Sequence, residues 1–303
     1  MRGIIVVAAM VFSQAVFAGS IAITFDDSPT WDSHYLTGPE RTEKLIKALD
    51  RAGVEQAMFF ANTIRMDEAG EKRLRAFASA GHLIANHSHS HKSAGKLTTA
   101  EYLADVELAH NRLSALPGFA PFHRFPYLNR GEGIAQVAEL NAGIKAMGYA
   151  DGYVTVDNYD FYISHLFDQA ISANASVDYQ ALESLYVDAM WQAIEFYDNM
   201  AIEFLGRSPH HVLLLHENDA AVLFVEALVA KIRSEGWDII PASEAYQDPI
   251  SQWFDADGMH GQGRVAAIAQ QNGAKAETLK HPYENTDTLD KLFRTKALGQ
   301  ELQ

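Results

Sequence analysis

Short apolar runs alternate with helix-forming segments along most of this chain, and this alternation constrains the fold more than any other feature. Apolar runs predict strands at residues 21–25, 57–61, 83–86, 122–125, 152–156, 212–216 and 237–240. Spacings of three and four residues predict helices at 40–52, 66–80, 98–116, 134–148, 178–205 and 218–235. Strands and helices in alternation predict an α/β fold with a mainly parallel sheet, and seven strands favour an irregular barrel over an open sheet.

Two stretches fall outside this alternation. Residues 161–177 are interpreted as a long connection that leads into the 178–205 helix. Beyond Pro241 the chain becomes polar, with one helix-like stretch near its end. We therefore expect a single catalytic domain at 19–245 and an extension at 246–303 that wraps its surface.

The first 18 residues predict a secretory signal peptide. An arginine precedes an apolar run, and Val16 and Ala18 are small or apolar residues placed for cleavage after Ala18. A retained membrane anchor is the alternative. It is disfavoured because the run is near the minimum of about 18 residues and is interrupted by Ser13 and Gln14. We expect an exported protein, periplasmic or secreted, with no stable membrane anchor after cleavage.

The composition argues against several kinds of partner and ligand. The 303-residue chain carries 24 basic and 39 acidic residues, a formal net charge of −15, which disfavours electrostatic binding to nucleic acid. It has no cysteine, so an exported form has no disulfide, and a metal site must use His, Asp or Glu. The oligomeric state is unknown from the sequence.

Titratable side chains stand at the ends of five predicted strands. These are Asp26 and Asp27 after 21–25, His87 after 83–86, Arg124 near the end of 122–125, Asp157 after 152–156, and His216 at the end of 212–216. In barrels of this type the carboxyl ends of the strands carry the active site. We therefore expect these side chains to share one pocket.

Two of these positions carry patterns typical of a metal site. His87 and His91 in HSHSH would face the same way on a helical turn, and His89 would point elsewhere. Asp26 and Asp27 in TFDDSP are two carboxylates at a strand end, whose repulsion a divalent cation would relieve. Each pattern alone has a structural explanation, as a polar loop or a turn cap. Together they predict a His, His, Asp site with open positions for water and substrate.

Five short motifs in order resemble those of the polysaccharide deacetylase family, the NodB-homology or carbohydrate esterase family 4 enzymes. They are TFDD (24–27), HSHSH (87–91), RFPY (124–127), DNYDF (157–161) and LLLH (213–216). The resemblance covers about residues 20 to 240. It implies a deformed (β/α) barrel of about seven parallel strands, of NodB type. It also implies one divalent metal ion, Zn²⁺ or alternatively Co²⁺ or Ni²⁺.

The resemblance also implies roles for individual residues. Asp27, His87 and His91 correspond to the metal ligands, and Asp26 corresponds to the general base that acts on a metal-activated water. By the same resemblance, Arg124 orients Asp26, and the backbone N–H of Tyr127 stabilises the oxyanion. His216 acts as the general acid and Asp160 supports it. Leu214, Phe161 and Tyr127 contact the substrate.

The chain departs from the family pattern at three positions, Ser28, Phe161 and Glu217, none of which is an inferred catalytic group. We therefore predict a hydrolase that removes N-acetyl groups from glycans containing N-acetylglucosamine, such as chitin oligosaccharides or peptidoglycan. An O-acetyl esterase of xylan type would use the same site. A small-amide hydrolase is disfavoured by the signal peptide, and a non-catalytic glycan-binding protein by the presence of Asp26 and His216.

Overall fold

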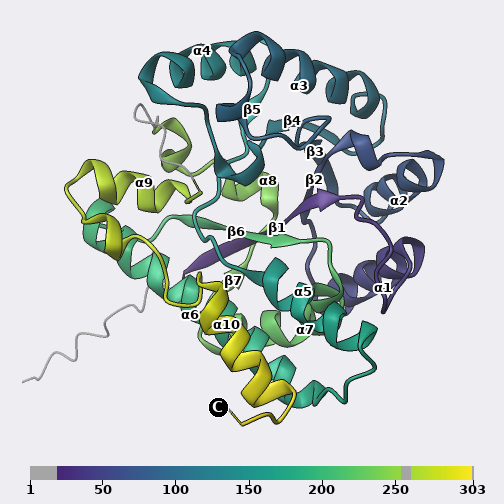
Figure 1. Ribbon diagram of the computed structural model, residues 1–303. Coiled ribbons are helices and arrows are strands. Elements are labelled where there is room, and N and C mark those ends of the chain that lie inside the picture. Colours follow the sequence, from purple (N-terminus) through teal and green to yellow (C-terminus); the bar gives the residue numbers. More distant parts are fainter. Residues whose placement is uncertain (1–18, 254–260, 302–303) are drawn as a thin grey trace, which may run out of the picture.

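The computed structural model describes residues 19–253 and 261–301, and its centre is a parallel sheet curved into half a barrel (Figure 1). The strands are β1 (Ser20–Ser28), β2 (Met58–Ala61), β3 (Leu83–Asn86), β4 (Phe119–His123), β5 (Ala150–Asp151), β6 (His210–His216) and β7 (Asp238–Ile239). Their order is β5-β4-β3-β2-β1-β6, with β7 beside β1, and all pairs are parallel. The predicted α/β fold, a deformed barrel of seven parallel strands, is confirmed.

The sheet is built around β1. β6 pairs with one edge of β1 from Ser20 to Asp26. The other edge is shared, because β7 pairs at Ser20 and Ile21 and β2 pairs from Thr24 onward. The side chains of Ile21, Thr24 and Phe25 are fully buried. A strand covered on both faces needs a continuous apolar run, which is why its sequence does not alternate.

Helices surround this sheet (Figure 1). They are α1 (Gly38–Arg51), α2 (Glu68–Ser79), α3 (Thr99–Leu113), α4 (Gly133–Ala146), α5 (Asp160–Ser172), α6 (Tyr179–Leu205), α7 (Asp219–Ser234), α8 (Ala242–Ala245), α9 (Arg264–Gln271) and α10 (Thr286–Leu292). The six predicted helices correspond to α1–α4, α6 and α7. Two of them start at capping boxes, in which Thr37 pairs with Glu40 and Thr98 with Glu101.

The predicted strand at 152–156 is wrong in its bounds. β5 ends at Asp151, and the chain then crosses to the opposite edge of the half barrel, where Val156 forms an isolated parallel bridge with Leu213 of β6. Tyr153, Val154 and Val156 are nearly or fully buried. The run is therefore as apolar as a strand, although it connects the two edges of the half barrel instead of extending β5.

The predicted long connection at 161–177 is also wrong, because most of it is helix α5. Ile163, Leu166, Phe167 and Ala170 form the buried face of α5 at spacings of three and four residues. This spacing is a helix signal. It was missed because the start of the helix coincides with the DNYDF motif, whose polar and aromatic residues are typical of a loop.

The chain beyond β7 packs against the barrel. α9 and the π-helical turn Phe293–Ala297 contact α6, and α10 contacts α5 (Figure 1). Val265, Ile268 and Phe293 belong to the same buried apolar cluster as the strands. The predicted signal peptide, residues 1–18, lies outside the described residues. In the described part of the chain, no helix combines the length and apolarity needed to span a bilayer.

Candidate active site

A cleft of about 330 Å³ opens where the carboxyl ends of the strands meet. Its wall contains Asp26, Asp27, His87, His91, Tyr127, Leu128, Asp157, Asn158, Tyr159, Phe161, Leu214, His216 and Gly261. The strand-end residues Asp26, Asp27, His87, Asp157 and His216 therefore share one pocket, as the sequence predicted. Arg124 lies behind this wall and reaches the cleft through Asp26.

Asp26 and Asp27 face the same cleft because the end of β1 is irregular. In a regular strand, neighbouring side chains point to opposite faces. The register between β1 and β2 shifts between Phe25 and Ser28, and Asp27 has a left-handed backbone with φ of 67°. This irregularity lets both carboxylates line the cleft.

His87 and His91 meet without the helical turn that the sequence predicted. β3 ends at Asn86, and the next residues form a tight turn with positive φ at Ser88 (67°) and His91 (55°). The Asp105 carboxylate accepts two backbone N–H groups of this turn, at 3.1 and 3.0 Å. The two imidazole rings lie 5.0 Å apart. The pairing is therefore made by a hydrogen-bonded turn and not by helical periodicity.

Asp27, His87 and His91 offer ligand atoms that all lie within 4.8 Å of one another. The His91 Nε2 is 3.0 Å and the His87 Nε2 is 4.0 Å from Asp27 Oδ1. His87 Nδ1 hydrogen-bonds to the Arg124 carbonyl at 2.9 Å, which leaves its Nε2 free as an acceptor. Asn62 donates to Asp27 at 2.9 Å and fixes that carboxylate. Two imidazoles and a carboxylate fit a divalent ion.

The charge state of this group also suits a cation. Burial would raise the pKa of Asp27, but His91, His216, His87 and Arg65 outweigh it and lower that pKa to about 2. Burial, assisted by the neighbouring His87, lowers the pKa of His91 to about 4. At neutral pH the carboxylate is therefore ionised and this imidazole is neutral, and these are the forms that ligate metals.

Asp26 is held by a buried arginine. Only 2% of Asp26 is exposed, and Arg124 Nη1 donates to its Oδ1. The same guanidinium donates to the Gly152 carbonyl at 2.7 Å and to the Tyr246 hydroxyl at 2.9 Å, and it stacks 3.8 Å above the Phe60 ring. Every side of Arg124 is occupied, so the orientation of the Asp26 carboxylate is fixed.

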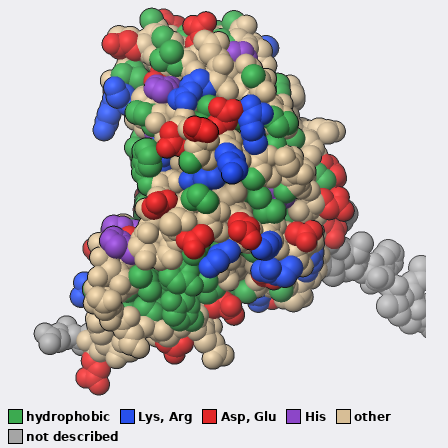
Figure 2. All heavy atoms as spheres, turned by 90° about the vertical axis from the view of Figure 1, so that its right-hand side faces the viewer, with side chains coloured by type: hydrophobic (Ala, Val, Ile, Leu, Met, Phe, Trp, Pro, Cys, Tyr) green, Lys and Arg blue, Asp and Glu red, His purple; other side chains and the backbone are tan. Residues whose placement is uncertain are grey.

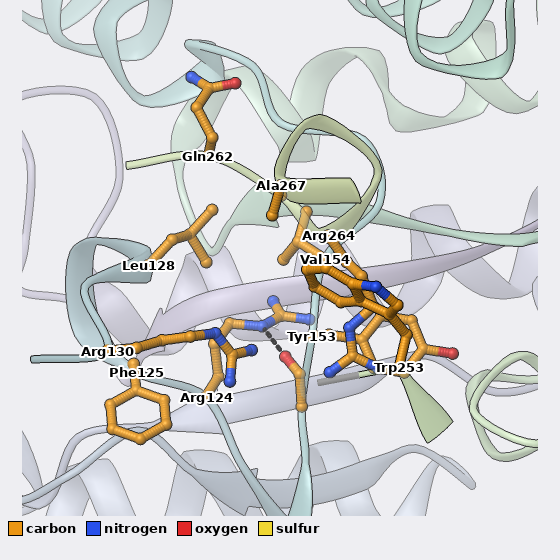
Figure 3. Close-up of a pocket in the computed structure, with 12 residues that line it drawn as sticks. Arg124, Phe125, Leu128, Arg130, Tyr153, Val154, Trp253, Gln262, Arg264 and Ala267 are labelled. Atoms are coloured by element: carbon orange, nitrogen blue, oxygen red, sulfur yellow. Dashed lines mark hydrogen bonds between the residues drawn. The ribbon is translucent and has the colours of Figure 1, made fainter. Parts of the chain in front are cut away.

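Behind Arg124 lies a second cavity of about 20 Å³, with Arg130 and Arg264 also in its wall (Figure 3). Both of these arginines pair with Asp151. The volume is enough for about one water molecule. We assign no ligand to this cavity.

His216 and Asp160 form a buried pair on the other side of the cleft. Asp160 accepts from His216 Nδ1 at 2.6 Å and from the His216 backbone N–H at 2.9 Å, and Asn218 donates to the same carboxylate at 2.8 Å. Burial would lower the pKa of His216, but the charge of Asp160 outweighs it and raises that pKa to about 9. At neutral pH the imidazole therefore carries a proton.

Tyr127 and Phe161 lie at the mouth of the cleft. Tyr127 has φ of 58°, and its ring, 4.7 Å from that of His91, belongs to a residue that is 61% exposed. Its backbone N–H makes no hydrogen bond within the described part of the chain. Phe161 packs edge-on against His216 at 5.5 Å. Leu214 also lines the cleft.

Three residues that support the site were missed in the sequence. Asn62 follows β2, so the strand-end rule that found the other residues also applied to it. Asn218 caps α7, and its side-chain amide reaches Asp160. Tyr246 lies beyond every motif, and no signal in the sequence links it to Arg124. Glu217, a departure from the family pattern, is fully buried and pairs with Arg73 away from the cleft.

Comparisons with known proteins bear on the family and on the fold. A family model described as polysaccharide deacetylase matches residues 15–147. The peptidoglycan-N-acetylglucosamine deacetylase of Bacillus cereus is 31% identical over 123 residues, which are 39% of this chain and 40% of that protein. The chain therefore spans about two fifths of the length of this curated relative.

Two solved structures share the fold. The chitin deacetylase of the fungal pathogen Colletotrichum lindemuthianum has a TM-score of 0.51 at 20% identity, over 80% of this chain and 94% of that one. A mutant of a pseudoenzyme of carbohydrate esterase family 4 has a TM-score of 0.54 at 13% identity, over 76% and 67% of the two chains. At these identities the likeness concerns the fold alone.

The fold is that of a deformed (β/α) barrel, and its cleft brings Asp26, His216 and the three clustered ligand-bearing side chains to one edge of the sheet. The resemblance to the polysaccharide deacetylase family that the five motifs predicted is confirmed, with the family model matching residues 15–147.

Proposed function

We propose that this protein is a metal-dependent N-deacetylase of glycans that contain N-acetylglucosamine, such as chitin oligosaccharides or peptidoglycan. One observation carries the proposal. A single cleft brings together a carboxyl group fixed by arginine, a protonated imidazole, and a His, His, Asp ligand set. Hydrolysis of an amide needs a base, an acid and an electrophile in this relationship.

Asp27, His87 and His91 would hold the ion, for which Zn²⁺ is the first candidate and Co²⁺ or Ni²⁺ are alternatives. A bound divalent ion supplies Lewis-acid polarisation of the acetyl carbonyl and brings the pKa of water down to about 7.

Asp26 acts as the general base that takes a proton from the attacking water. Its Oδ1 is engaged by Arg124, whereas its Oδ2 lies toward the ligand set, 3.6 Å from His87 Nε2. Oδ1 is therefore held in place by Arg124, and Oδ2 is available to accept the proton.

His216 acts as the general acid that protonates the departing nitrogen. An amine cannot leave as an anion, so this proton must arrive as the carbon–nitrogen bond breaks. Asp160 holds Nδ1, which leaves the proton on Nε2 free to be donated.

The free N–H of Tyr127 stabilises the oxyanion that forms when water adds to the acetyl carbonyl. Removing one such donor typically costs about 3 kcal/mol of transition-state stabilisation. Leu214 and Phe161 provide apolar contacts for the acetyl methyl group and the sugar face.

The place of action follows from the N-terminal segment. We propose that residues 1–18 direct export, so that the protein meets its glycan in the periplasm or outside the cell. The acidic net charge of −15 supports a neutral or cationic polymer over nucleic acid as the partner.

The test is acetate release by the purified protein from N-acetylglucosamine oligomers and, separately, from acetylated xylan. Asp26→Asn should reduce release from the oligomers by about 10²- to 10⁴-fold, the usual contribution of a general base. Asp50→Asn, at an exposed carboxylate of α1, is the matched control and should leave the rate unchanged.

Each other outcome rejects part of the proposal. Release from xylan alone would make the protein an O-acetyl esterase. No release from either substrate by a folded protein would favour a binding protein on this fold, and one of the similar structures is described as a pseudoenzyme.

A further inference from the structure

Asp157 is an acidic residue of the cleft that the proposed mechanism does not use. It joins the crossing segment 152–156 to the start of α5, and it lies in the same cleft wall as His216 and Leu214. Only 8% of the residue is exposed. One carboxyl oxygen accepts the N–H of Asn158 at 2.8 Å, and in the described part of the chain the other oxygen has no hydrogen-bond partner.

A second buried acid stands behind Asp157. Glu284, from the segment before α10, is 7% exposed. Its carboxylate already accepts from the Tyr197 hydroxyl, the Gln262 amide at 2.8 Å and the His281 backbone N–H at 3.0 Å. Glu284 therefore has its own donors and does not supply one to Asp157.

These surroundings set the charge state of Asp157. Burial raises its pKa well above the ordinary value, and the charge of Glu284 adds to that rise, which outweighs His216 and Lys280. Burial and the neighbouring Glu284 charge therefore favour the protonated form of this carboxyl group. A protonated carboxyl group offers one O–H donor as well as acceptor oxygens.

We propose that Asp157 is a specificity-determining residue that binds a ring hydroxyl group of the acetylated sugar beside the acetamido group. Asp157 lines the cleft and its second carboxyl oxygen is not among the buried atoms without a partner, so this oxygen is open to a ligand that supplies a hydrogen bond there. A hydroxyl group both donates and accepts, which matches a protonated carboxyl group. A cationic ligand would need an ionised Asp157 and would be repelled by the His216 imidazolium.

This inference rests on the proposed function, because it concerns the substrate of the same cleft. It adds that residues outside the five motifs shape recognition. Glu284 and the chain around it belong to the segment beyond β7, which helps to keep Asp157 in its uncharged form. The acetyl group is then selected together with its sugar, and not as an isolated acetate.

The first measurement is equilibrium binding of N-acetylglucosamine oligomers by calorimetry, in an Asp26→Asn background in which turnover is suppressed. Adding Asp157→Ala should raise Kd roughly tenfold, the usual effect of losing one hydrogen bond at a buried site. Adding Asp157→Asn should leave Kd within about threefold, because the amide keeps a donor and an acceptor. An unchanged Kd in the alanine variant, or an equal loss in both variants, would overturn the proposal.

The second measurement compares substrates with and without sugar hydroxyl groups. With Asp26 intact, Asp157→Ala should lower kcat/KM for the oligomers roughly tenfold and leave hydrolysis of 4-nitrophenyl acetate unchanged. An equal loss on both substrates would mean that Asp157 serves the chemistry or the fold, and would overturn the inference. If the protein binds oligomers but releases no acetate, the proposed function fails while the binding data still decide the role of Asp157.

Discussion

Left-handed backbone conformations at residues other than glycine are concentrated around the cleft. Among the described residues there are six such positions, and five of them are Asp27, Ser88, His91, Tyr127 and Leu128. Each costs of order 1–3 kcal/mol and persists only where neighbouring groups hold it. These conformations direct both carboxylates of TFDD into the cleft and bring the two histidines together. They also expose the N–H of Tyr127.

The Asp160–His216 pair predicts the alkaline limit of activity. His216 must be protonated to act as the acid, and its pKa is raised to about 9, so kcat/KM should fall as the pH rises through about 9. Asp160→Asn removes the charge that raises this pKa, so the alkaline limb should move to lower pH. Asp168→Asn, at a carboxylate that pairs with the exposed His34, should not move it. An unchanged limb in Asp160→Asn would contradict this assignment.

The same pair links protonation to stability. The folded-state pKa of His216 lies above the ordinary value of 6.5, so protonation favours the folded state. This contribution is fully present below about pH 6.5 and is lost as the pH rises through about 9. In Asp160→Asn, the free energy of unfolding should therefore fall less over this interval than in the parent protein.

Tyr246 predicts a loss of activity through Arg124. Its hydroxyl accepts from Arg124 and donates to the Tyr153 carbonyl at 3.1 Å. Tyr246→Phe leaves a buried guanidinium N–H without a partner, at a cost of about 1–3 kcal/mol. We expect kcat to fall about tenfold with little change in KM. Tyr153→Phe is the control, because the Tyr153 hydroxyl donates to the Ala245 carbonyl and not to Arg124. Equal effects of the two variants on kcat would exclude the proposed role of Tyr246.

Among individual residues, the sequence predicted the side chains that line the cleft but not the side chains that hydrogen-bond to them from behind. Asp26, His87 and His216 follow strands whose carboxyl ends share one edge, and that rule requires only the strand pattern. The bond from Tyr246 to Arg124 spans 122 residues and follows from packing alone. No local pattern encodes such a contact.

Two buried ion pairs join the elements that carry the cleft. Arg73 of α2 pairs with Glu217, the residue after β6, and Arg41 of α1 pairs with Asp219 at the start of α7. All four residues are at least nine-tenths buried. They connect the two outer helices to the strand end that presents His216.

Breaking one of these pairs should destabilise the fold. Arg73→Met leaves the fully buried Glu217 without its partner, and loss of one member of a buried pair typically costs about 3–5 kcal/mol. The double variant Arg73→Met with Glu217→Gln should recover a large part of this loss. Urea denaturation of the single and double variants measures the difference. A single variant as stable as the parent protein would show that the pair is not coupled to folding.

Helices and strands were predicted correctly where the apolar residues recur at a single regular spacing. The six helices with clear apolar spacing and the buried strands were found because burial on one face, or on both, leaves a regular pattern. Helix α5 and the crossing segment 152–156 were misassigned because apolar residues serve strand, helix and connection equally well. HSHSH was misassigned because its backbone N–H groups donate to the Asp105 carboxylate in a turn that is not helical.

The chain beyond β7 is part of the main core and contributes to the cleft. Gly263 lies so close to the crossing segment that a Cβ there would meet the Val154 carbonyl oxygen at 2.9 Å, and Arg264 N–H donates to that oxygen at 2.7 Å. On the face shown in Figure 2, acidic and basic side chains are interspersed and form no continuous basic area.

Truncation after residue 253 should prevent cooperative folding. The missing segment supplies Val265, Ile268, Leu279, Leu289 and Phe293 to the core, and each buried side chain of this size contributes about 1.5–3 kcal/mol. Their sum is comparable with the total stability of a typical domain. Thermal unfolding by circular dichroism is the measurement. A truncated chain that melts cooperatively at the parent temperature would contradict this integration.

We propose that one metal ion on Asp27, His87 and His91 supports deacetylation by Asp26 and His216. The direct test is acetate release from N-acetylglucosamine oligomers by chelator-treated protein, to which Zn²⁺ is returned in fractions of an equivalent. We predict negligible release after chelation and full recovery near one equivalent, with no recovery in His87→Ala. Release at an undiminished rate by the metal-free protein would contradict the claim.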